Sequence, residues 1–360
     1  MSRVTVAGLR ARALEAADLL PPLRLDVDGC RVEVATNDPD LEKALGRYFR
    51  ERRTESTGEP VFRIVAIEGP EVDVSLDLTV KPPEPGKAKV KEEWADVVDG
   101  RVVRKLTTGM LFAFGGHTHL AWGPCRANDN QVVNFVNNRY MQWRIEQGYV
   151  LAHAGAVARE GRGLAMCGAS GSGKSTTALG LVARGLDFVS NDRALLRPGP
   201  DGVELLGIPK HPRVNPGTLV HNPLLHPILT AEQRDAYRAM DPDHLLRLED
   251  KYDVLIDEIV GPDRFPLRAR LQALVVVAWS GVGKARIRPV DLSARDDLLA
   301  HVMKSPGLFY EPSDEADVRL DAGRYVDVVA RVPVYEITGT RNFAAAEELC
   351  AAVLDGPSRN

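Results

Sequence analysis

The sequence predicts a mixed α/β protein in two parts, an N-terminal α+β domain at residues 1–127 and a C-terminal α/β domain at residues 128–360. Three observations lead to this prediction. Strand-like and helix-like hydrophobic periods alternate along the first part. An apolar helical segment follows at about Asn130–Gln147. From Tyr149 onward, short apolar runs are separated by glycine-rich turns, which is typical of a sheet covered by helices.

Length and composition exclude several classes of protein. At 360 residues the chain is long enough for two domains, and 44% hydrophobic with 27% charged residues is a globular composition. A net charge of −4 gives no broad basic surface, so we expect no nucleic-acid partner. No apolar run is long enough to cross a bilayer, and the N-terminus lacks the order of a secretory signal. With four dispersed cysteines, we expect reduced thiols, a cytoplasmic location and no membrane partner.

The N-terminal part is expected to be rich in strands. A helix with an acidic start is expected at Asp38–Arg53. The expected strands are Cys30–Ala35, Val61–Ile67, Val72–Val80, Val102–Leu106, Met110–Gly115 and Thr118–Trp122. The helix that follows at Asn130–Gln147 is apolar on much of its circumference, which predicts that it is buried. Asp129 and Gly148 are its expected N-cap and C′ residues.

A complete phosphate-loop motif begins the central part of the second domain. Its residues match the pattern GxxxxGK[ST] and are Gly168, Ala169, Ser170, Gly171, Ser172, Gly173, Lys174 and Ser175. The apolar run Leu164–Cys167 precedes the motif, and the helix-forming run Thr176–Arg184 follows it. Strand, glycine-rich loop and helix in this order are the context in which the motif binds nucleoside triphosphates. We therefore expect a P-loop at Gly168–Ser175.

Each residue type in this loop has a chemical role in binding a nucleoside triphosphate. The glycines let the backbone curl so that successive N–H groups face phosphate oxygens, and the new helix adds the positive end of its dipole. Lys174 can reach the β- and γ-phosphates, and the Ser175 hydroxyl can bind Mg²⁺. The expected ligands are ATP, or another nucleoside triphosphate, and Mg²⁺. Thr176 completes the set of candidate nucleotide-binding residues in this segment.

Two neighbouring strands carry further candidates. Leu186–Ser190 reads as a strand that ends at Asn191-Asp192, and ligands of open α/β sheets lie at the carboxyl ends of strands. Asp192 is therefore placed to hold Mg²⁺, although an aspartate that caps a turn is the alternative. Upstream, a hairpin would set the His153 strand antiparallel to the strand before the P-loop. A single histidine in an apolar run is also typical of a core residue, so both interpretations stay open.

These segments together, HAGAV and then GASGSGKSTTALGLVARGLDFVSND, resemble the catalytic domain of bacterial HPr kinase/phosphorylase. They resemble the HPr-kinase-related proteins more closely. The shared order is a histidine-bearing strand, a P-loop 15 residues later, a helix that ends in Arg-Gly and a strand that ends in an acidic pair. The clear match spans about Leu151–Asp192. The resemblance implies a P-loop domain akin to that of phosphoenolpyruvate carboxykinase.

The resemblance also implies an activity, that of an ATP- and Mg²⁺-dependent kinase. Such a transferase moves the γ-phosphate to an acceptor on a protein or a small molecule, and the sequence does not identify the acceptor. The resemblance assigns the phosphates and Mg²⁺ to Gly168–Ser175, and it places His153 beside the reacting phosphate and Asp192 near the metal. HPr kinases assemble into rings, so homo-oligomerisation is left open.

One position departs from the family's pattern. The general base of the family is the first carboxylate of the acidic pair, and Asn191 occupies that position. An amide cannot accept a proton at neutral pH. Either Asp192 or His153 replaces the base, or transfer relies on positioning and charge. A third option is that the chain binds nucleotide without transferring phosphate.

Several features downstream allow alternative interpretations. Lys210 and Arg213 follow a predicted hairpin and could bind phosphate charge, or they are solvated loop cations. Tyr252–Ile259 resembles a Walker B strand, which would favour a regulatory ATPase, but it also fits a strand alternating with solvent. Gly281–Lys284 imitates a second P-loop, but alanines occupy positions where the motif needs glycine and serine or threonine. A kinase, a regulatory ATPase and a non-catalytic nucleotide-binding module are thus the three functional hypotheses.

Overall fold

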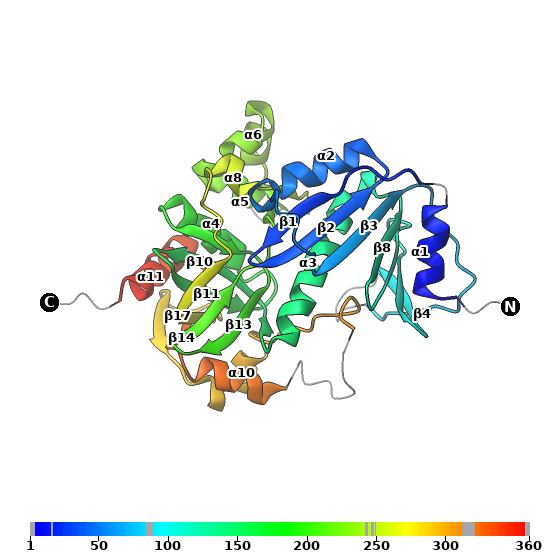
Figure 1. Ribbon diagram of the computed structural model, residues 1–360. Coiled ribbons are helices and arrows are strands. Elements are labelled where there is room, and N and C mark those ends of the chain that lie inside the picture. Colours follow the sequence, from blue (N-terminus) through cyan, green and yellow to red (C-terminus); the bar gives the residue numbers. More distant parts are fainter. Residues whose placement is uncertain are drawn as a thin grey trace. The chain divides into compact units, whose positions relative to one another are not determined.

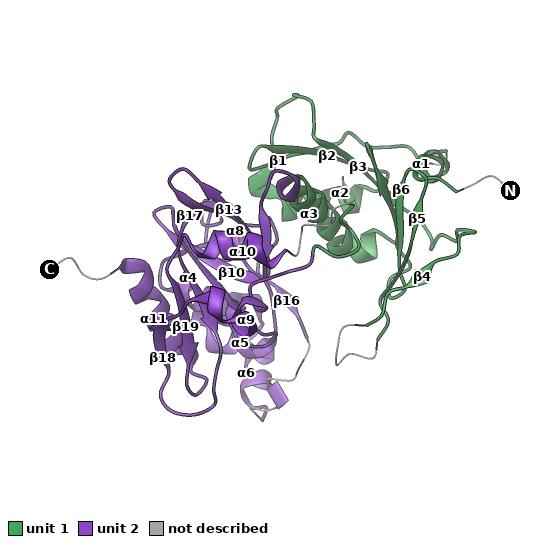
Figure 2. Cartoon of the chain, turned by 90° about the horizontal axis from the view of Figure 1, so that it is seen from below, with its two compact units in different colours: residues 1–143, 306–315 green, residues 144–305, 316–360 purple. Residues whose placement is uncertain are grey.

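The protein is a mixed α/β chain with more than one β-sheet, and its internal contacts divide it into two compact units (Figures 1 and 2). The computed structural model describes residues 4–15, 17–83, 89–241, 244–245, 248, 250–311 and 321–356. Unit 1 comprises residues 1–143 and 306–315, and unit 2 comprises residues 144–305 and 316–360. The expected boundary at residue 127 precedes helix α3 (Asp129–Glu146), whereas the two units divide within that helix.

In its described residues, unit 1 holds an eight-stranded mixed sheet in the order β1-β2-β3-β8-β7-β6-β5-β4. The strands are β1 (Leu23–Val27), β2 (Cys30–Thr36), β3 (Phe62–Glu68), β4 (Thr79–Val80), β5 (Glu92–Val97), β6 (Gly100–Lys105), β7 (Leu111–Gly115) and β8 (Thr118–Gly123). The helical segments are α1 (Val6–Leu14), α2 (Pro39–Tyr48), η1 (Arg50–Arg52), η2 (Arg126–Asn128) and the first part of α3. Only the pairs β2–β3 and β3–β8 are parallel.

Aromatic packing explains why the first part of α3 and the segment around Phe309 belong to unit 1. Phe135 of α3 lies 5.1 Å from Phe112 and 6.0 Å from Phe309, measured between ring centroids. Phe114 stacks on Phe309 with an interplanar angle of 19°. The buried Arg139 of α3 lies over the Phe114 ring as a cation–π partner. The expectation that this helix is buried is confirmed for these residues.

One predicted strand of this unit does not form over most of its length. Of the segment Val72–Val80, only Thr79–Val80 forms a strand. Val72 and Val74 are buried in the core beneath α1 without pairing to a neighbour strand along the segment. The apolar alternation there reflects burial of an irregular segment, which has the same period as a strand.

In its described residues, unit 2 is organised around a nine-stranded mixed sheet. Its main path is β12-β10-β11-β17-β14-β13-β9, and β19 pairs with both β17 and β18. The strands are β9 (Val150–Ala152), β10 (Ala154–Arg159), β11 (Arg162–Gly168), β12 (Asp187–Ser190), β13 (Ala194–Gly199), β14 (Gly202–Leu206), β17 (Arg268–Val277), β18 (Arg286–Pro289) and β19 (Val334–Thr338). A separate ribbon pairs β15 (Arg213–Val214) with β16 (Tyr252–Asp253).

Helices cover both faces of the unit 2 sheet (Figure 1). The helical segments are α4 (Lys174–Ala183), α5 (Pro216–His221), η3 (Pro223–Ile228), α6 (Ala231–Arg238), α8 (Ile256–Ile259), η4 (Leu292–Ala294), α9 (Asp296–Leu299), α10 (Ala322–Val329) and α11 (Phe343–Asp355). Helices α4 and α11 pack together and against β11. On the other face, residues of α9 and α10 join the alternate side chains of β10, β11 and β17 in one core. A sheet buried on both faces explains the continuous apolar runs of these strands.

The order of strands places three loops at one edge of this sheet. Strand β17 runs parallel to both β11 and β19. Its residue Val277 lies opposite Gly168 of β11 and opposite Ile337 of β19. The segments that follow these strands therefore leave the sheet at the same edge, which is where open α/β sheets place ligands. The Gly168–Ser175 segment is the first of the three.

The strand that the Walker B interpretation requires at Tyr252–Ile259 does not form. The segment forms the two-residue strand β16 and then the short helix α8, with Asp257 buried in the helix. The Asp257 carboxylate lies 3.9 Å from the ring nitrogen Nε2 of His211. Tyr252, Val254 and Ile256 alternate as in a strand, whereas Ile256 and Ile259 are spaced for one turn of helix, so the short segment fits both structures. Among the described residues, no helix has the length and apolarity needed to cross a bilayer.

Candidate functional site

The Gly168–Ser175 loop connects the end of β11 to the start of α4. Gly168, Gly171 and Gly173 have φ angles of 147°, 77° and 97°, which residues with a Cβ atom rarely adopt. A Cβ atom on Gly168 would lie 2.6 Å from the carbonyl oxygen of Val277 in the adjacent strand. The glycines are therefore required by the backbone path itself, which turns tightly between a buried strand and a buried helix.

Lys174 begins helix α4 and bends back over the loop. Its Nζ donates hydrogen bonds to the carbonyl oxygens of Gly168 at 2.8 Å and of Ala169 at 3.1 Å. Burial lowers the pKa of the Lys174 ammonium, and the negative charge of Asp192 opposes this shift. A buried lysine whose hydrogen bonds go to loop carbonyls can exchange these partners for the oxygens of an anion in the loop.

Two aromatic residues, from the segments that follow β17 and β19, contact the loop. Trp279, two residues after β17, donates its indole N–H to the Ser172 carbonyl oxygen at 2.9 Å. Phe343, the first residue of α11, packs so closely on Gly173 that a Cβ atom there would lie 2.1 Å from its ring. These contacts fix the loop conformation from the two other segments that leave the same edge of the sheet.

His153 and Asp192 form a pair beside this loop. Strands β10 and β11 form the expected antiparallel hairpin, and β9 pairs with β13, so the residues after β9 and before β13 meet. His153 Nε2 lies 3.1 Å from Asp192 Oδ1. Because a carboxylate only accepts, this hydrogen bond requires the proton on Nε2 and leaves Nδ1 as the basic nitrogen of the neutral ring. A Cβ atom on Gly155 would lie 2.9 Å from the Asn191 carbonyl oxygen, so glycine is required for this close approach.

The Asp192 carboxylate lies among positive charges. Burial, the largest single effect, raises the pKa of its carboxyl group, but the hydrogen bond from His153 and the neighbouring positive charges together lower it by more. The positive charges of Lys304 and Arg193 act in the same direction as that hydrogen bond, and the pKa is held well below its usual range. Asp192 is thus a carboxylate at neutral pH in a cationic environment, which suits a polyanionic ligand accompanied by a metal ion.

The two candidate cations after β14 differ in their partners. Arg213 is exposed and forms an ion pair with Asp253 across the β15–β16 ribbon, at 3.0 Å. Burial lowers the pKa of the Lys210 ammonium to about 8, and Arg193 contributes to the shift. Because the charge of Asp192 also acts on Lys210, this lysine belongs to the same electrostatic cluster as the His153–Asp192 pair. Arg213 is already engaged by a carboxylate.

Two oxygen atoms at the site are buried without a hydrogen-bond partner among the described residues. They are Ser172 Oγ in the loop and Asn191 Oδ1 at the end of β12. Buried polar atoms are normally satisfied, so unpaired ones beside a glycine-rich loop fit a site that a polar ligand completes. The half-buried Ser175 lies one residue beyond Lys174, at the first turn of α4.

Lys304 is a residue of the site that the sequence did not predict. It follows α9, and its backbone N–H donates to the carbonyl oxygen of Leu151 in β9 at 3.1 Å. No sequence motif includes Lys304, and it is far along the chain from the Gly168–Ser175 loop. Only the pairing of its segment with β9 brings it to the site, and no sequence pattern encoded that pairing.

Comparisons with known proteins give little further information. No family model matches the chain, and no curated protein matches it. Among solved structures, the HPr(Ser) kinase/phosphatase from Coxiella burnetii is similar, with 11% sequence identity and a TM-score of 0.30. That similarity covers 56% of this chain and 88% of the other. A likeness of this extent establishes neither a family nor a function.

Proposed function

We propose that this protein is an ATP- and Mg²⁺-dependent phosphotransferase of the HPr-kinase-related kind, with its nucleotide site at Gly168–Ser175. The observation that carries the proposal is that α4 begins beside the segment that carries Asp192. A Cβ atom on Gly155 would lie 2.9 Å from the Asn191 carbonyl oxygen and 3.7 Å from that of Lys174. Lys174 thus starts its helix next to the His153–Asp192 pair. A glycine-rich loop before a helix, a lysine and a carboxylate are parts that phosphoryl transfer requires. The motif resemblance over Leu151–Asp192 supports the same proposal.

The residues present fit a magnesium ion held together with a nucleotide. Among the described residues, no group of three or more histidine, cysteine or acidic side chains could hold a metal alone. Mg²⁺ is commonly bound by one or two protein oxygens together with phosphate oxygens. Ser175 and Asp192 would supply the protein oxygens. When bound, Mg²⁺ neutralises charge on the β- and γ-phosphates.

The transfer step follows from the arrangement of the side chains. The acceptor oxygen forms a bond to the γ-phosphorus while the bond from that phosphorus to the β–γ bridging oxygen breaks, and the electron pair leaves with ADP. The acceptor hydroxyl proton goes to Nδ1 of His153, which Asp192 orients through Nε2. Asn191 cannot take this proton, but it can donate a hydrogen bond. His153 thus replaces the carboxylate base in this proposal.

The proposal is tested by following γ-labelled ATP with Mg²⁺ in host cytosolic extract. Wild type, Asp192→Asn and His153→Gln are compared, each checked for its unfolding midpoint. We expect label on a specific protein or metabolite with wild type. A loss on the order of 10²–10⁴-fold is expected for His153→Gln, the usual range for a general base. Label that appears only as free phosphate would instead indicate a regulatory ATPase, and binding without turnover would indicate a nucleotide-binding module.

We expect ATP affinity to fall as pH rises through about 8 because of Lys210, whose pKa burial lowers to about 8. Below that pH its ammonium is positive and attracts phosphate, and above it the neutral amine does not. The groups that act on it are Arg193, Asp192, Arg213 and Asp253. Between pH 7.5 and 9.5, the affinity should fall about tenfold, the lower end of the range for losing one charged hydrogen bond.

The matched control for this pH dependence is Lys210→Arg, which keeps its charge throughout the range. Its ATP affinity, measured by titration calorimetry, should vary by less than about twofold over the same range. A wild-type affinity as flat as that of Lys210→Arg would show that Lys210 does not contact phosphate.

A further inference from the structure

Lys304 is fixed by its backbone to β9, the strand that His153 follows. Its N–H donates to the Leu151 carbonyl oxygen at 3.1 Å, and the His153 N–H donates to the Val302 carbonyl oxygen at 2.8 Å. Between these bonds, Ala152 and Met303 form an antiparallel bridge. Strand β9 therefore has β13, which follows Asp192, on one side and the Val302–Lys304 segment on the other.

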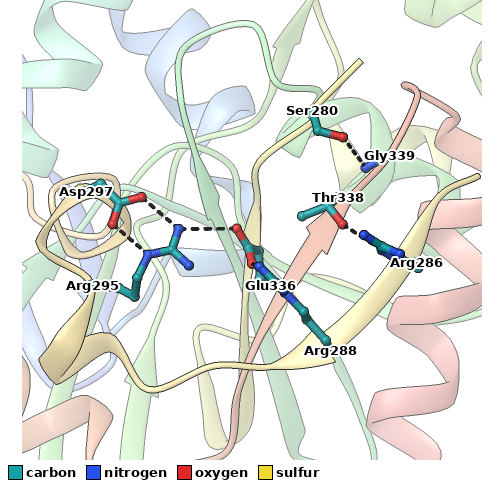
Figure 3. A network of polar contacts seen from close by, with 8 residues as sticks. All are labelled: Ser280, Arg286, Arg288, Arg295, Asp297, Glu336, Thr338 and Gly339. Carbon is teal, nitrogen blue, oxygen red and sulfur yellow. Dashed lines mark hydrogen bonds and ion pairs between the residues drawn. The ribbon is translucent and has the colours of Figure 1, made fainter. Parts of the chain in front are cut away.

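The segment that carries Lys304 is anchored before it reaches β9. Arg295, which precedes α9, pairs with Asp297 at 2.7 Å and lies 3.5 Å from the buried Glu336 of β19, as Figure 3 shows. Glu336 is held on its other side by Arg288 of β18, at 2.7 Å. Leu298, Leu299 and Val302 then enter the core of unit 2. Lys304 thus follows a segment that is fixed at both ends.

A further contact holds the same point of the strand. The buried Tyr325 of α10 donates its hydroxyl hydrogen to the Leu151 carbonyl oxygen at 2.7 Å. The Lys304 N–H shares this acceptor. The backbone at Lys304 is therefore tied to β9 and, through the same carbonyl, to a helix on the face of the sheet.

The charge of Lys304 acts on the two central groups of the site. Burial lowers the pKa of Lys174, and the positive charge of Lys304 lowers it further. The same charge helps to lower the pKa of Asp192, after the larger effects of burial and of the His153 hydrogen bond. Lys304 is half-buried, and among the described residues its ammonium forms neither a hydrogen bond nor a close ion pair.

Two lysines held near each other repel when no anion lies between them. A solvated surface lysine would avoid this cost by turning away, but the Lys304 backbone is fixed and its side chain is half-buried. The arrangement suits an anion with several negative oxygens, which both ammonium groups can contact. The nucleotide of the proposed function has such a group at its γ-phosphate.

We propose that Lys304 is a second phosphate-binding lysine, which contacts the γ-phosphoryl oxygens of ATP and the charge on them during transfer. This inference rests on the proposed function. While the acceptor oxygen bonds to the γ-phosphorus and the bond to the bridging oxygen breaks, the equatorial oxygens keep their negative charge. Lys174 spans the β- and γ-phosphates, and Lys304 approaches the γ-phosphate from the His153 side. The two lysines would therefore respond differently to removal of the γ-phosphate.

The test compares ATP with ADP, each with Mg²⁺, by titration calorimetry of the full chain. Lys304→Met keeps the aliphatic stem and removes the charge, Lys304→Arg keeps the charge, and Lys43→Met is the matched control on an exposed lysine of α2 in unit 1. We expect Lys304→Met to weaken ATP binding about tenfold to a hundredfold, the range for one charged hydrogen bond, and ADP binding by less than about threefold. Lys304→Arg should recover most of the ATP affinity, and Lys43→Met should match wild type.

The outcomes separate this inference from the proposed function. If wild type binds ATP but Lys304→Met weakens ATP and ADP equally, or neither, the role of Lys304 is overturned and the proposed function stands. If wild type binds neither nucleotide, both are overturned. Lys304→Arg and Lys304→Met both keep the backbone hydrogen bond to Leu151, so both should unfold at the wild-type midpoint. A lower midpoint would show that weak binding reflects lost folding and not a lost contact to phosphate.

Discussion

Replacing Lys174 by alanine is expected to lower phosphoryl transfer from ATP on the order of 10²–10³-fold or more, the effect of removing one transition-state donor. The ammonium belongs to the first residue of α4 and donates hydrogen bonds to the carbonyl oxygens of Gly168 and Ala169. In the proposed complex it turns to the β- and γ-phosphates, where charge accumulates during transfer. ATP binding should also weaken about tenfold to a hundredfold, because a charged hydrogen bond is lost.

This substitution also removes two hydrogen bonds from the loop, so folding must be measured with it. We expect a small decrease in the unfolding midpoint, since each hydrogen bond contributes about 1 kcal/mol. Lys43→Ala is the matched control, because Lys43 is exposed on α2 of unit 1 and has no role in the proposed mechanism. Transfer by Lys174→Ala within about threefold of wild type would contradict a phosphate role for Lys174.

Gly207→Ala is expected to destabilise the protein by about 3 kcal/mol, at the upper end of the usual range for overpacking. A Cβ atom at this position would lie 1.9 Å from the carbonyl oxygen of Val189 and 2.9 Å from its carbonyl carbon. These are backbone atoms of β12, so they cannot rotate away as a side chain would. The Gly207 N–H is bonded to the Leu267 carbonyl oxygen at 2.7 Å, which prevents the glycine from moving instead.

The same substitution should disturb the candidate site. Val189 is three residues before Asp192, and the next residue after Gly207 donates its N–H to Ser190 Oγ at 3.2 Å. Displacing β12 would therefore move the carboxylate away from His153. Gly217→Ala is the matched control, because its Cβ atom would meet only Leu245, at 3.7 Å and 3.9 Å. Chemical unfolding should separate the two variants, and equal midpoints would show that the Gly207 contact is not tight.

The hairpins and the long helix could be predicted because their signals are local. The turn residues at Pro198–Gly202 predict the β13–β14 hairpin, which forms with Gly199 opposite Gly202. The strand and helix around Gly168–Ser175 were also predicted, because glycines, an apolar run and a helix former follow one another in the sequence. The helix α1 and strands β1 and β5 were not predicted, since their apolar patterns are short and interrupted by charges.

The site could be predicted only where its residues lie on those local elements. His153 and Asp192 were chosen separately, and the structure brings them within hydrogen-bond distance through the pairing of β9 with β13. Lys304 depends on the pairing of an irregular segment with β9, for which the sequence has no period. The prediction of a strand at Tyr252–Ile259 was wrong for a related reason, because a short apolar run fits a strand and a turn of helix equally well.

The most direct test of the central claim is to titrate the wild-type protein with ATP and with AMP, each with Mg²⁺, by calorimetry. The P-loop proposal assigns the binding energy to the β- and γ-phosphates, through Lys174 and the backbone N–H groups of Gly168–Ser175. It predicts measurable ATP binding and AMP binding weaker by about a hundredfold or more, since at least two charged contacts are missing. Equal affinity for the two nucleotides, or no binding of ATP, would contradict a triphosphate site at this loop.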